Sequence, residues 1–307
     1  MNNYLAVSLG VLCAGLGGEL FVRGAVDLGR WLRVPIAVIG ATIAAFATSS
    51  PELAVALTAA GAGVPEISLG DALGSNVVNI SLILALALLV APIETTFATV
   101  QRDFTVALLT PIILALLAWD GYLSRTDGLI LLVIFGVWLT LGVQHARAQR
   151  AALPQQLVTE AGRRALIFCA IGLALLVAAG RLIVEGAKGI ATAYDIDSFI
   201  IGATVVAIAT GAPELATTMI AVVRQHEQLG LGNLLGSNIF NGLLIVALAA
   251  IVSPITVVWH EVAVGLFFGA LTTLVILPFR STVIGRGRGL LLLATYGLYL
   301  VLILQSW

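Results

Sequence analysis

The chain alternates long apolar stretches with short polar breaks from one end to the other. Ten of the stretches approach the length of about 20 residues that crosses a bilayer as a helix. Arg, Gly, Pro and Asp cluster in the breaks, as is typical of turns. The predicted spans are residues 4–28, 36–59, 67–90, 102–118, 128–146, 164–190, 198–222, 230–252, 258–279 and 289–306. This pattern predicts an all-α polytopic membrane protein with ten transmembrane helices.

Composition supports a membrane location. Of the 307 residues, 60% are hydrophobic and only 10% are charged, whereas soluble domains carry about 25% charged residues. The nearly balanced charge, with 15 basic and 16 acidic residues, argues against nucleic acid as a partner. Membrane lipid is the partner that such a surface implies, and no feature of the sequence indicates a protein partner.

The basic residues are distributed unevenly between the two sides of the predicted membrane. When the loops are numbered alternately, all but three of the 15 Lys and Arg residues fall on one side. Arg125 and Lys188 fall on the other side, and Arg181 lies within the sixth span. Because cytoplasmic loops are enriched in Lys and Arg, we assign the basic side to the cytoplasm. Both termini are therefore predicted to lie outside.

The second half of the chain repeats the first at a constant offset of 162 residues. The segment Leu-Gly-Asp-Ala-Leu-Gly-Ser-Asn-Val-Val-Asn at 69–79 returns as Leu-Gly-Asn-Leu-Leu-Gly-Ser-Asn-Ile-Phe-Asn at 231–241. The Pro-Glu pair that ends at Glu52 returns at Glu214 by the same offset. The sequence therefore contains an internal repeat.

The number of spans in each half predicts how the repeats are oriented. Five is odd, so the second half must enter the membrane from the opposite side. Such inverted-topology repeats are frequent in secondary transporters, whose ion sites lie near the midplane where the repeats meet. We expect residues 1–150 and 164–307 to form the two repeats, with their strongest motifs at 36–93 and 198–255. Residues 151–163 form a cytoplasmic linker.

The second span contains the least expected residues for a membrane segment. A charged side chain at bilayer depth costs roughly 2.5–3.5 kcal/mol on insertion scales and is a functional hypothesis by default. Thr48 and Ser49 share a helical face with Glu52. Pro51 removes a backbone donor and clashes with the preceding turn, so we expect a broken helix with freed carbonyls around Ala45 to Thr48. The seventh span repeats this set with Thr210, Pro213 and Glu214 and with carbonyls near Ala207.

The third span adds Asp71, Ser75 and Asn79 on one helical face. The eighth span adds Asn233, Ser237 and Asn241 in the same way. Carboxylates, hydroxyls, amides and carbonyls are hard oxygen ligands, which suit Ca²⁺ or Na⁺ better than zinc or copper. Two glutamates would offset the charge of one Ca²⁺. No cofactor is expected, and the ions would be transported substrates.

Each of these features also has a structural explanation. A proline in a membrane helix usually produces only a kink, and a buried glutamate can be an ion-pair partner. Gly-Ser-Asn triples can serve close packing and interhelical hydrogen bonds. The recurrence of all three features at one offset makes a purely structural explanation of the set improbable.

Charged residues also recur in the first and sixth spans. Glu19 and Arg23 correspond to Arg181 and Glu185 with the charges exchanged. Each i,i+4 pair can neutralise itself within its helix or pair with its counterpart across the repeat axis. A third arrangement places both pairs near the interface, where long side chains snorkel. The sequence leaves the three arrangements open.

At these motifs the sequence resembles the cation/Ca²⁺ exchanger superfamily, and most closely the prokaryotic sodium/calcium antiporters. The resemblance rests on Thr-Ser-Ser-Pro-Glu at 48–52 and on Gly-Ser-Asn-x-x-Asn at 74–79 and 236–241, and covers nearly the whole chain. It implies a transporter of the prokaryotic plasma (inner) membrane that exchanges Ca²⁺ for Na⁺ by alternating access. It also implies that the first and sixth spans slide across the others.

The resemblance further implies four cation sites between the repeats. The shared carboxylate ligands of these sites would be Glu52 and Glu214. The hydroxyl ligands would be Thr48, Ser49, Ser75, Thr210 and Ser237. The flanking amides would be Asn79 and Asn241, and the backbone carbonyls would be those of Ala45 and Ala207.

Three positions depart from the family pattern. Gly211 lacks the usual serine hydroxyl, Asn241 stands where several prokaryotic members have Asp, and Asp71 stands where Asn is usual. The missing hydroxyl places one Na⁺ site, and hence the coupling ratio, in question. Asp71 could replace a charge, or it could titrate and favour coupling to H⁺. Ca²⁺/H⁺ or other cation/H⁺ exchange is therefore the alternative, and a cation channel is a more remote one. An enzyme is not expected, because the chain has no HExxH or Gly-x-Gly-Asp motif.

Overall fold

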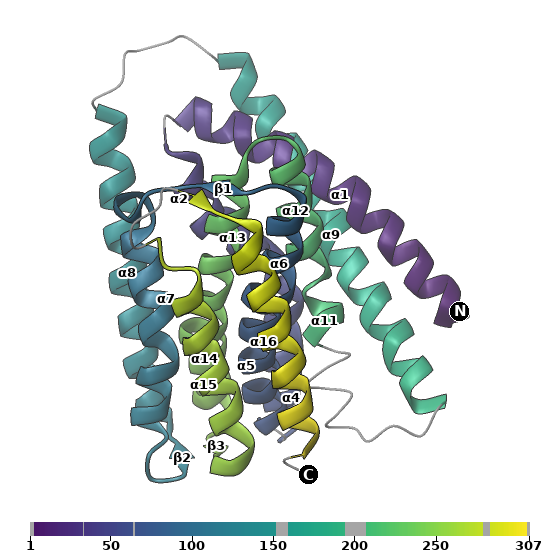
Figure 1. Cartoon of the computed structure of the whole chain (residues 1–307), viewed down its shortest axis with the longest axis vertical. Coiled ribbons are helices and arrows are strands. Elements are labelled where there is room, and N and C mark those ends of the chain that lie inside the picture. Colours follow the sequence, from purple (N-terminus) through teal and green to yellow (C-terminus); the bar gives the residue numbers. More distant parts are fainter. Residues whose placement is uncertain are drawn as a thin grey trace.

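The computed structural model of the chain describes residues 3–32, 34–63, 65–151, 159–193, 207–278 and 283–305 (Figure 1). This part of the chain is almost entirely helical. The first half contains α1 (Asn3–Leu32), α2 (Ile36–Ile39), η1 (Gly40–Ala44), α3 (Ala45–Thr48), α4 (Ser50–Gly61), α5 (Glu66–Val78), η2 (Asn79–Leu84), α6 (Ala85–Val90), α7 (Phe97–Leu117) and α8 (Arg125–Ala151). The second half contains α9 (Thr159–Ala193), α11 (Ala207–Thr210), α12 (Ala212–Val223), α13 (Glu227–Ile239), η4 (Phe240–Ile245), α14 (Val246–Val252), α15 (Trp259–Val275) and α16 (Arg286–Gln305).

The helices confirm a polytopic membrane protein. Seven described segments are each long and apolar enough to cross a bilayer, and Ile36–Thr48 with Ser50–Gly61 forms one further, bent span. Two shorter apolar helices, Ala212–Val223 and Val262–Val275, lie within the seventh and ninth predicted spans. The seventh predicted span begins at residue 198, outside the described residues. The count of ten therefore stays a prediction.

Two short β-ribbons show that the halves are inverted. The strands are β1 (Ile93–Glu94), β2 (Tyr122–Leu123), β3 (Ile255–Thr256) and β4 (Val283–Ile284). β1 and β3 occupy the same place in their repeats, as do β2 and β4. β1 pairs antiparallel with β4, and β2 pairs antiparallel with β3. Each ribbon thus joins the two halves, and the ribbons lie at opposite ends of the bundle (Figure 1). This arrangement confirms the inversion.

The predicted breaks occur at matching positions of the two repeats. α3 and α4 meet at Ser49 (φ −81°, ψ 12°) with a bend of 46°. α11 and α12 meet at Gly211 (φ −72°, ψ 0°). Pro51 and Pro213 each stand in the first turn of the second helix, where no intrahelical partner for an N–H is required. The prolines therefore begin new half-helices.

The α1–α9 pair forms a separate layer along one edge of the bundle (Figure 1). A Cβ atom added to Gly24 would lie 2.6 Å from the Cys169 amide nitrogen, and one added to Gly172 would lie 2.5 Å from that of Phe21. Glycine at these positions lets the two backbones approach closely. Several buried side chains of the pair belong to a hydrophobic cluster smaller than the main core, and this cluster also includes residues of α2, η1, α3, α12 and α13.

Glycines also let α13 cross η1 closely. A Cβ atom at Gly236 would collide with the carbonyl oxygen of Ala41, and one at Gly40 with that of Leu229. The expectation of close approach at the glycines of the Gly-Ser-Asn motif is thus confirmed for α13. At this crossing the eighth predicted span packs against the second.

We predict that Gly236→Ala lowers the stability of the protein by about 1–3 kcal/mol, because an overpacked methyl group must displace the backbone of η1. Gly136→Ala on α8 is the matched control, since an added Cβ there meets no atom within 4 Å. Thermal unfolding in detergent should show a loss for the first variant and none for the second. Equal melting temperatures would contradict the close crossing.

Candidate functional site

The two glutamates of the repeated motif lie together in the interior. Glu52 and Glu214 stand in the first turns of α4 and α12, immediately after the two breaks, and each is only 1% exposed. The charge of Glu214 is near enough to act on that of Glu52. The inverted halves therefore contribute one carboxylate each to a single buried region.

Hydroxyl groups of the first repeat reach the glutamate of the second. Ser49 Oγ donates a hydrogen bond to Glu214 Oε1 at 3.1 Å. Thr48 also lies close to Glu214, and in the reciprocal arrangement Thr210 lies close to Glu52. The helical face that the sequence assigned to Thr48, Ser49 and Glu52 is thus interrupted by the break at Ser49, which turns this hydroxyl toward the partner repeat.

The surroundings of the two glutamates are unequal. Ser237 Oγ donates to Glu214 Oε1 at 3.3 Å, so this carboxylate oxygen accepts from two serines. Gly211 occupies the position equivalent to Ser49 and has no hydroxyl to offer Glu52. Ser75, the counterpart of Ser237, is buried, and its Oγ has no hydrogen-bond partner among the described residues. More hydroxyl groups therefore lie beside Glu214 than beside Glu52.

Asp71 brings a third carboxylate into this region. It is 3% exposed on α5, and its charge acts on Glu52. Its counterpart Asn233 instead accepts a hydrogen bond from Thr48 Oγ1 at 3.2 Å through Oδ1. Within the described part of the chain, however, no three His, Cys, Asp or Glu side chains are grouped closely enough to hold a metal ion alone. A bound cation would therefore need neutral oxygen ligands as well.

The expectation that the break frees the carbonyl of Ala45 is wrong. This oxygen accepts the backbone amide of Ser49 at 2.9 Å, and that of Ala207 accepts the amide of Gly211 at 3.1 Å. The breaks fall one turn later than these carbonyls, so their helical bonds persist. A carbonyl oxygen has a second lone pair, which keeps Ala45 and Ala207 as candidate ligands.

Several buried oxygens in the region have no protein partner. All twelve residues that the sequence singled out are at most 3% exposed. Buried polar atoms are normally hydrogen-bonded, and exceptions require an explanation such as a bound ion. Among the described residues, the unpartnered oxygens include Glu52 Oε2, Glu214 Oε2, Ser75 Oγ, Asn79 Oδ1 and Asn241 Oδ1. These atoms are the hard ligands that Ca²⁺ and Na⁺ prefer.

Comparison with known proteins decides the family. A family model described as sodium/calcium exchanger protein matches residues 3–143 and 164–305. The chain belongs to this exchanger family. Its members are transporters rather than enzymes, which confirms the resemblance seen in the motifs.

Individual members of the exchanger family match over most of their length. A putative antiporter, CaxA, from Alkalimonas amylolytica is 35% identical over 81% of this chain and 80% of its own. The sodium/calcium exchanger MaX1 from Methanosarcina acetivorans is 26% identical over 98% of each chain. A solved structure of the sodium-calcium exchanger NCX_Mj superposes with a TM-score of 0.85 at 32% identity, covering 97% of both chains.

Two asparagines that the sequence prediction did not select hold the exchanger's halves together. Asn76 Nδ2 donates to the backbone oxygen of Asn238 at 3.2 Å, and Asn238 Nδ2 donates to that of Asn76 at 3.1 Å. Asn79 Nδ2 also donates to Asn238 Oδ1 at 3.0 Å. Asn76 and Asn238 are 162 residues apart, so the reciprocal bonds cross the repeat axis. The repeat offset, which relates the two Gly-Ser-Asn segments, is the signal that could have identified this pair.

The helices also widen beside this asparagine clasp. The π-helical segments η2 and η4 begin at Asn79 and Phe240, at corresponding places in the two repeats. Single π-helical turns inside α-helices are frequent at functional sites. No sequence signal predicted them. They lie within the third and eighth predicted spans, at the level of Asn79 and Asn241.

We predict that Asn238→Ala destabilises the exchanger more than Asn76→Ala. The Asn238 side chain makes two interhelical hydrogen bonds, whereas that of Asn76 makes one. Each buried group left unpaired costs about 1–3 kcal/mol. Thermal unfolding in detergent measures both losses, with Thr140→Ala on the exposed face of α8 as a control. Equal losses would contradict the predicted ranking, and no loss in either variant would show that the clasp does not hold the halves together.

Proposed function

We propose that this protein exchanges Ca²⁺ for Na⁺ across a prokaryotic plasma (inner) membrane. The observation that carries the proposal is the buried Glu52–Glu214 pair, to which the two inverted halves contribute one carboxylate each and in which each carboxylate has an oxygen with no partner among the described residues. The match to NCX_Mj, a sodium-calcium exchanger, supports the choice of ions.

The charges of the site support competition between the two ions. Two carboxylates offset one Ca²⁺, and the hydroxyl, amide and carbonyl oxygens complete the six to eight ligands that Ca²⁺ takes. Na⁺ ions would use the same oxygens. Glu52 and Glu214 are therefore proposed as the shared ligands. The hydroxyls, the amides of Asn79 and Asn241 and the carbonyls of Ala45 and Ala207 are proposed as additional donors.

Occupancy of this site would control alternating access. To change access from one side to the other, the protein would pass through a conformation in which the site is closed to water on both sides. With no cation bound, two uncompensated carboxylates at bilayer depth make this conformation costly. Either Ca²⁺ or Na⁺ removes that cost, and a ligand shifts a conformational equilibrium only through such differential stabilisation. The α1–α9 pair packs on the bundle through a hydrophobic cluster smaller than the main core, and it contacts α12. We propose that this pair slides along the remaining helices to expose the site to either side.

We also propose that residues 1–150 and 164–307 are the two functional repeats and that both termini face outside. The basic ends of the helices support this orientation, because Lys and Arg are enriched on the cytoplasmic side. Both repeats contribute to the ion site, so neither unit would transport alone.

Coupling to H⁺ is the second candidate, and Asp71 is the observation that favours it. Its carboxylate acts on Glu52 from a position where the other repeat has neutral Asn233. Proteoliposomes distinguish the two functions when Ca²⁺ uptake is driven in turn by an outward Na⁺ gradient and by a proton gradient without Na⁺. Uptake driven only by the proton gradient would reject the Na⁺ proposal.

We predict that Glu52→Gln and Glu214→Gln each reduce Na⁺-gradient-driven uptake of radiolabelled Ca²⁺ to the level of protein-free vesicles. Either substitution removes a charge that both ions require. Glu94→Gln, at an exposed position outside the site, is the matched control and should transport at the wild-type rate. Retained uptake in either site variant would reject the shared-ligand assignment.

We predict that Gly211→Ser strengthens Na⁺ binding, because it supplies beside Glu52 the hydroxyl that Ser49 supplies beside Glu214. Gly211 has a negative φ (φ −72°, ψ 0°), so a side chain there causes no backbone strain. One hydrogen bond or ligand of this kind is worth about 1.5 kcal/mol, or about tenfold in the half-saturating Na⁺ concentration. Gly211→Ala controls for the added bulk. Identical Na⁺ dependence in the two variants would contradict the missing-ligand account.

A further inference from the structure

A basic pocket lies away from the ion site, where the α1–α9 pair meets the turn between α12 and α13. Its volume is about 200 Å³, and the residues at its rim include Arg23, Arg30, Arg164, Arg224 and His226. A water molecule occupies about 30 Å³ in the liquid. The pocket therefore has room for a group much larger than water.

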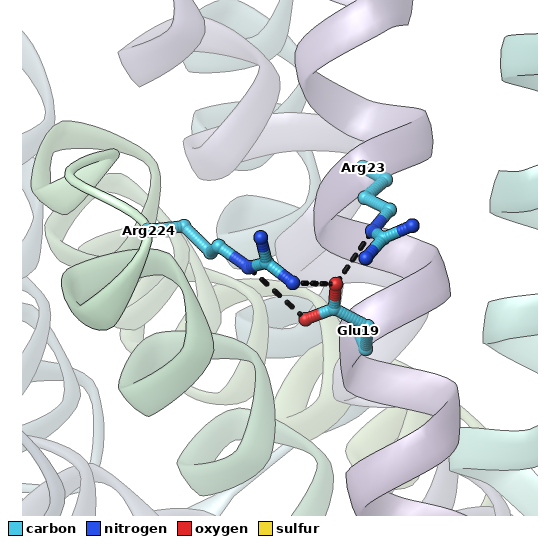
Figure 2. A network of polar contacts seen from close by, with 3 residues as sticks. All are labelled: Glu19, Arg23 and Arg224. Carbon is cyan, nitrogen blue, oxygen red and sulfur yellow. Dashed lines mark hydrogen bonds and ion pairs between the residues drawn. The ribbon is translucent and has the colours of Figure 1, made fainter.

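Beside this pocket, an ion-pair network joins α1 of the α1–α9 pair to the end of α12 in the bundle. Figure 2 shows Glu19 and Arg23 on α1 and Arg224 reaching across from the end of α12. Arg23 Nε contacts Glu19 Oε1, and Arg224 contacts the same carboxylate through Nη2 and Nε. The within-helix pairing of Glu19 with Arg23 is thus confirmed, with Arg224 as an additional partner. Arg23 and Arg224, whose guanidinium groups carry further N–H donors, both line the pocket.

The acidic residues do not balance the charge of the pocket. Arg30 Nη1 lies 3.6 Å from Asp27 Oδ1, and its side chain is 73% exposed. Arg164 lies over the ring of Phe168, with 5.0 Å between its Cζ atom and the ring centroid. No ion pair of Arg164 is found within the described residues. Among the side chains that the structure describes, four arginines face two nearby carboxylates, Glu19 and Asp27, which leaves an excess of positive charge.

The pocket lies at the level expected for lipid headgroups. Trp31, at the end of α1, is 37% exposed and packs against Gly162 at the start of α9. Tryptophan is enriched where the hydrocarbon meets the headgroups. The pocket is also at the basic end of the molecule, which the Lys/Arg distribution assigns to the cytoplasm.

We propose that this pocket binds the phosphate group of an anionic phospholipid from the cytoplasmic leaflet. Guanidinium groups bind phosphate through paired, charge-assisted hydrogen bonds, and basic pockets between membrane helices bind anionic headgroups. A phosphate held by Arg164 on α9 and Arg224 beside α12 joins the α1–α9 pair to the bundle. The lipid thereby stabilises one position of the pair relative to the bundle.

Binding of phosphatidylglycerol to the full chain in a neutral detergent tests this site without any ion gradient. Native mass spectrometry counts the retained lipid, and thermal unfolding gives an independent measure of its binding. Each arginine near an anionic surface contributes about fivefold to affinity. We therefore expect about fivefold weaker binding for Arg164→Gln and about 25-fold for the Arg164→Gln/Arg224→Gln double variant. Arg164→Lys keeps the charge and should retain most of the affinity.

Arg286→Gln is the matched control, because Arg286 is exposed at the start of α16 and does not line the pocket. Its lipid affinity should stay within twofold of the wild type. Equal losses in Arg286→Gln and Arg164→Gln, or no loss in either, would overturn the proposal. Protection by inorganic phosphate as strong as that by the lipid would overturn the assignment to a lipid. None of these outcomes depends on whether the exchanged ions are Ca²⁺ and Na⁺.

Discussion

The structure depends on the cost of holding two carboxylates together inside a membrane protein. A charge at bilayer depth costs roughly 2.5–3.5 kcal/mol on insertion scales, and here Glu52 and Glu214 are both buried and repel one another. The protein offsets part of this cost with hydroxyls, three of them near Glu214. We propose that a cation removes the remaining cost. In this proposal the same cost makes the site resist movement when no cation is bound, which links ion occupancy to conformational change.

The inverted repeat is the architecture that brings these carboxylates together. One helix break presents a single glutamate, and its inverted copy presents the other from the opposite direction. The asparagine clasp between Asn76 and Asn238 and the two β-ribbons hold the halves in this relation. The α1–α9 pair lies outside this core, joined through small residues and the ion pairs of Glu19. In the proposed mechanism, movement of this pair against the core would open the site alternately to the two sides of the membrane.

The sequence predicted the features that depend on local chemistry and on the repeat offset. Apolar spans, the breaks before Pro51 and Pro213 and the inversion all follow from these two signals. It did not predict that Ser49 would bond to Glu214, or that Glu19 would bond to Arg224. Those partners are 165 and 205 residues apart, and their contact depends on how whole helices cross. The carbonyl of Ala45 shows the opposite error, because a local rule about proline placed the break one turn too early.

Equilibrium binding of radiolabelled Ca²⁺ to the purified protein tests most directly whether Glu52 and Glu214 form one site shared by competing cations. Binding is measured at constant pH and ionic strength while Na⁺ replaces an inert organic cation. The account predicts one Ca²⁺ per chain at saturation and its complete, cooperative displacement by Na⁺. Ca²⁺ that remains bound in saturating Na⁺, or a second independent Ca²⁺ per chain, would contradict it.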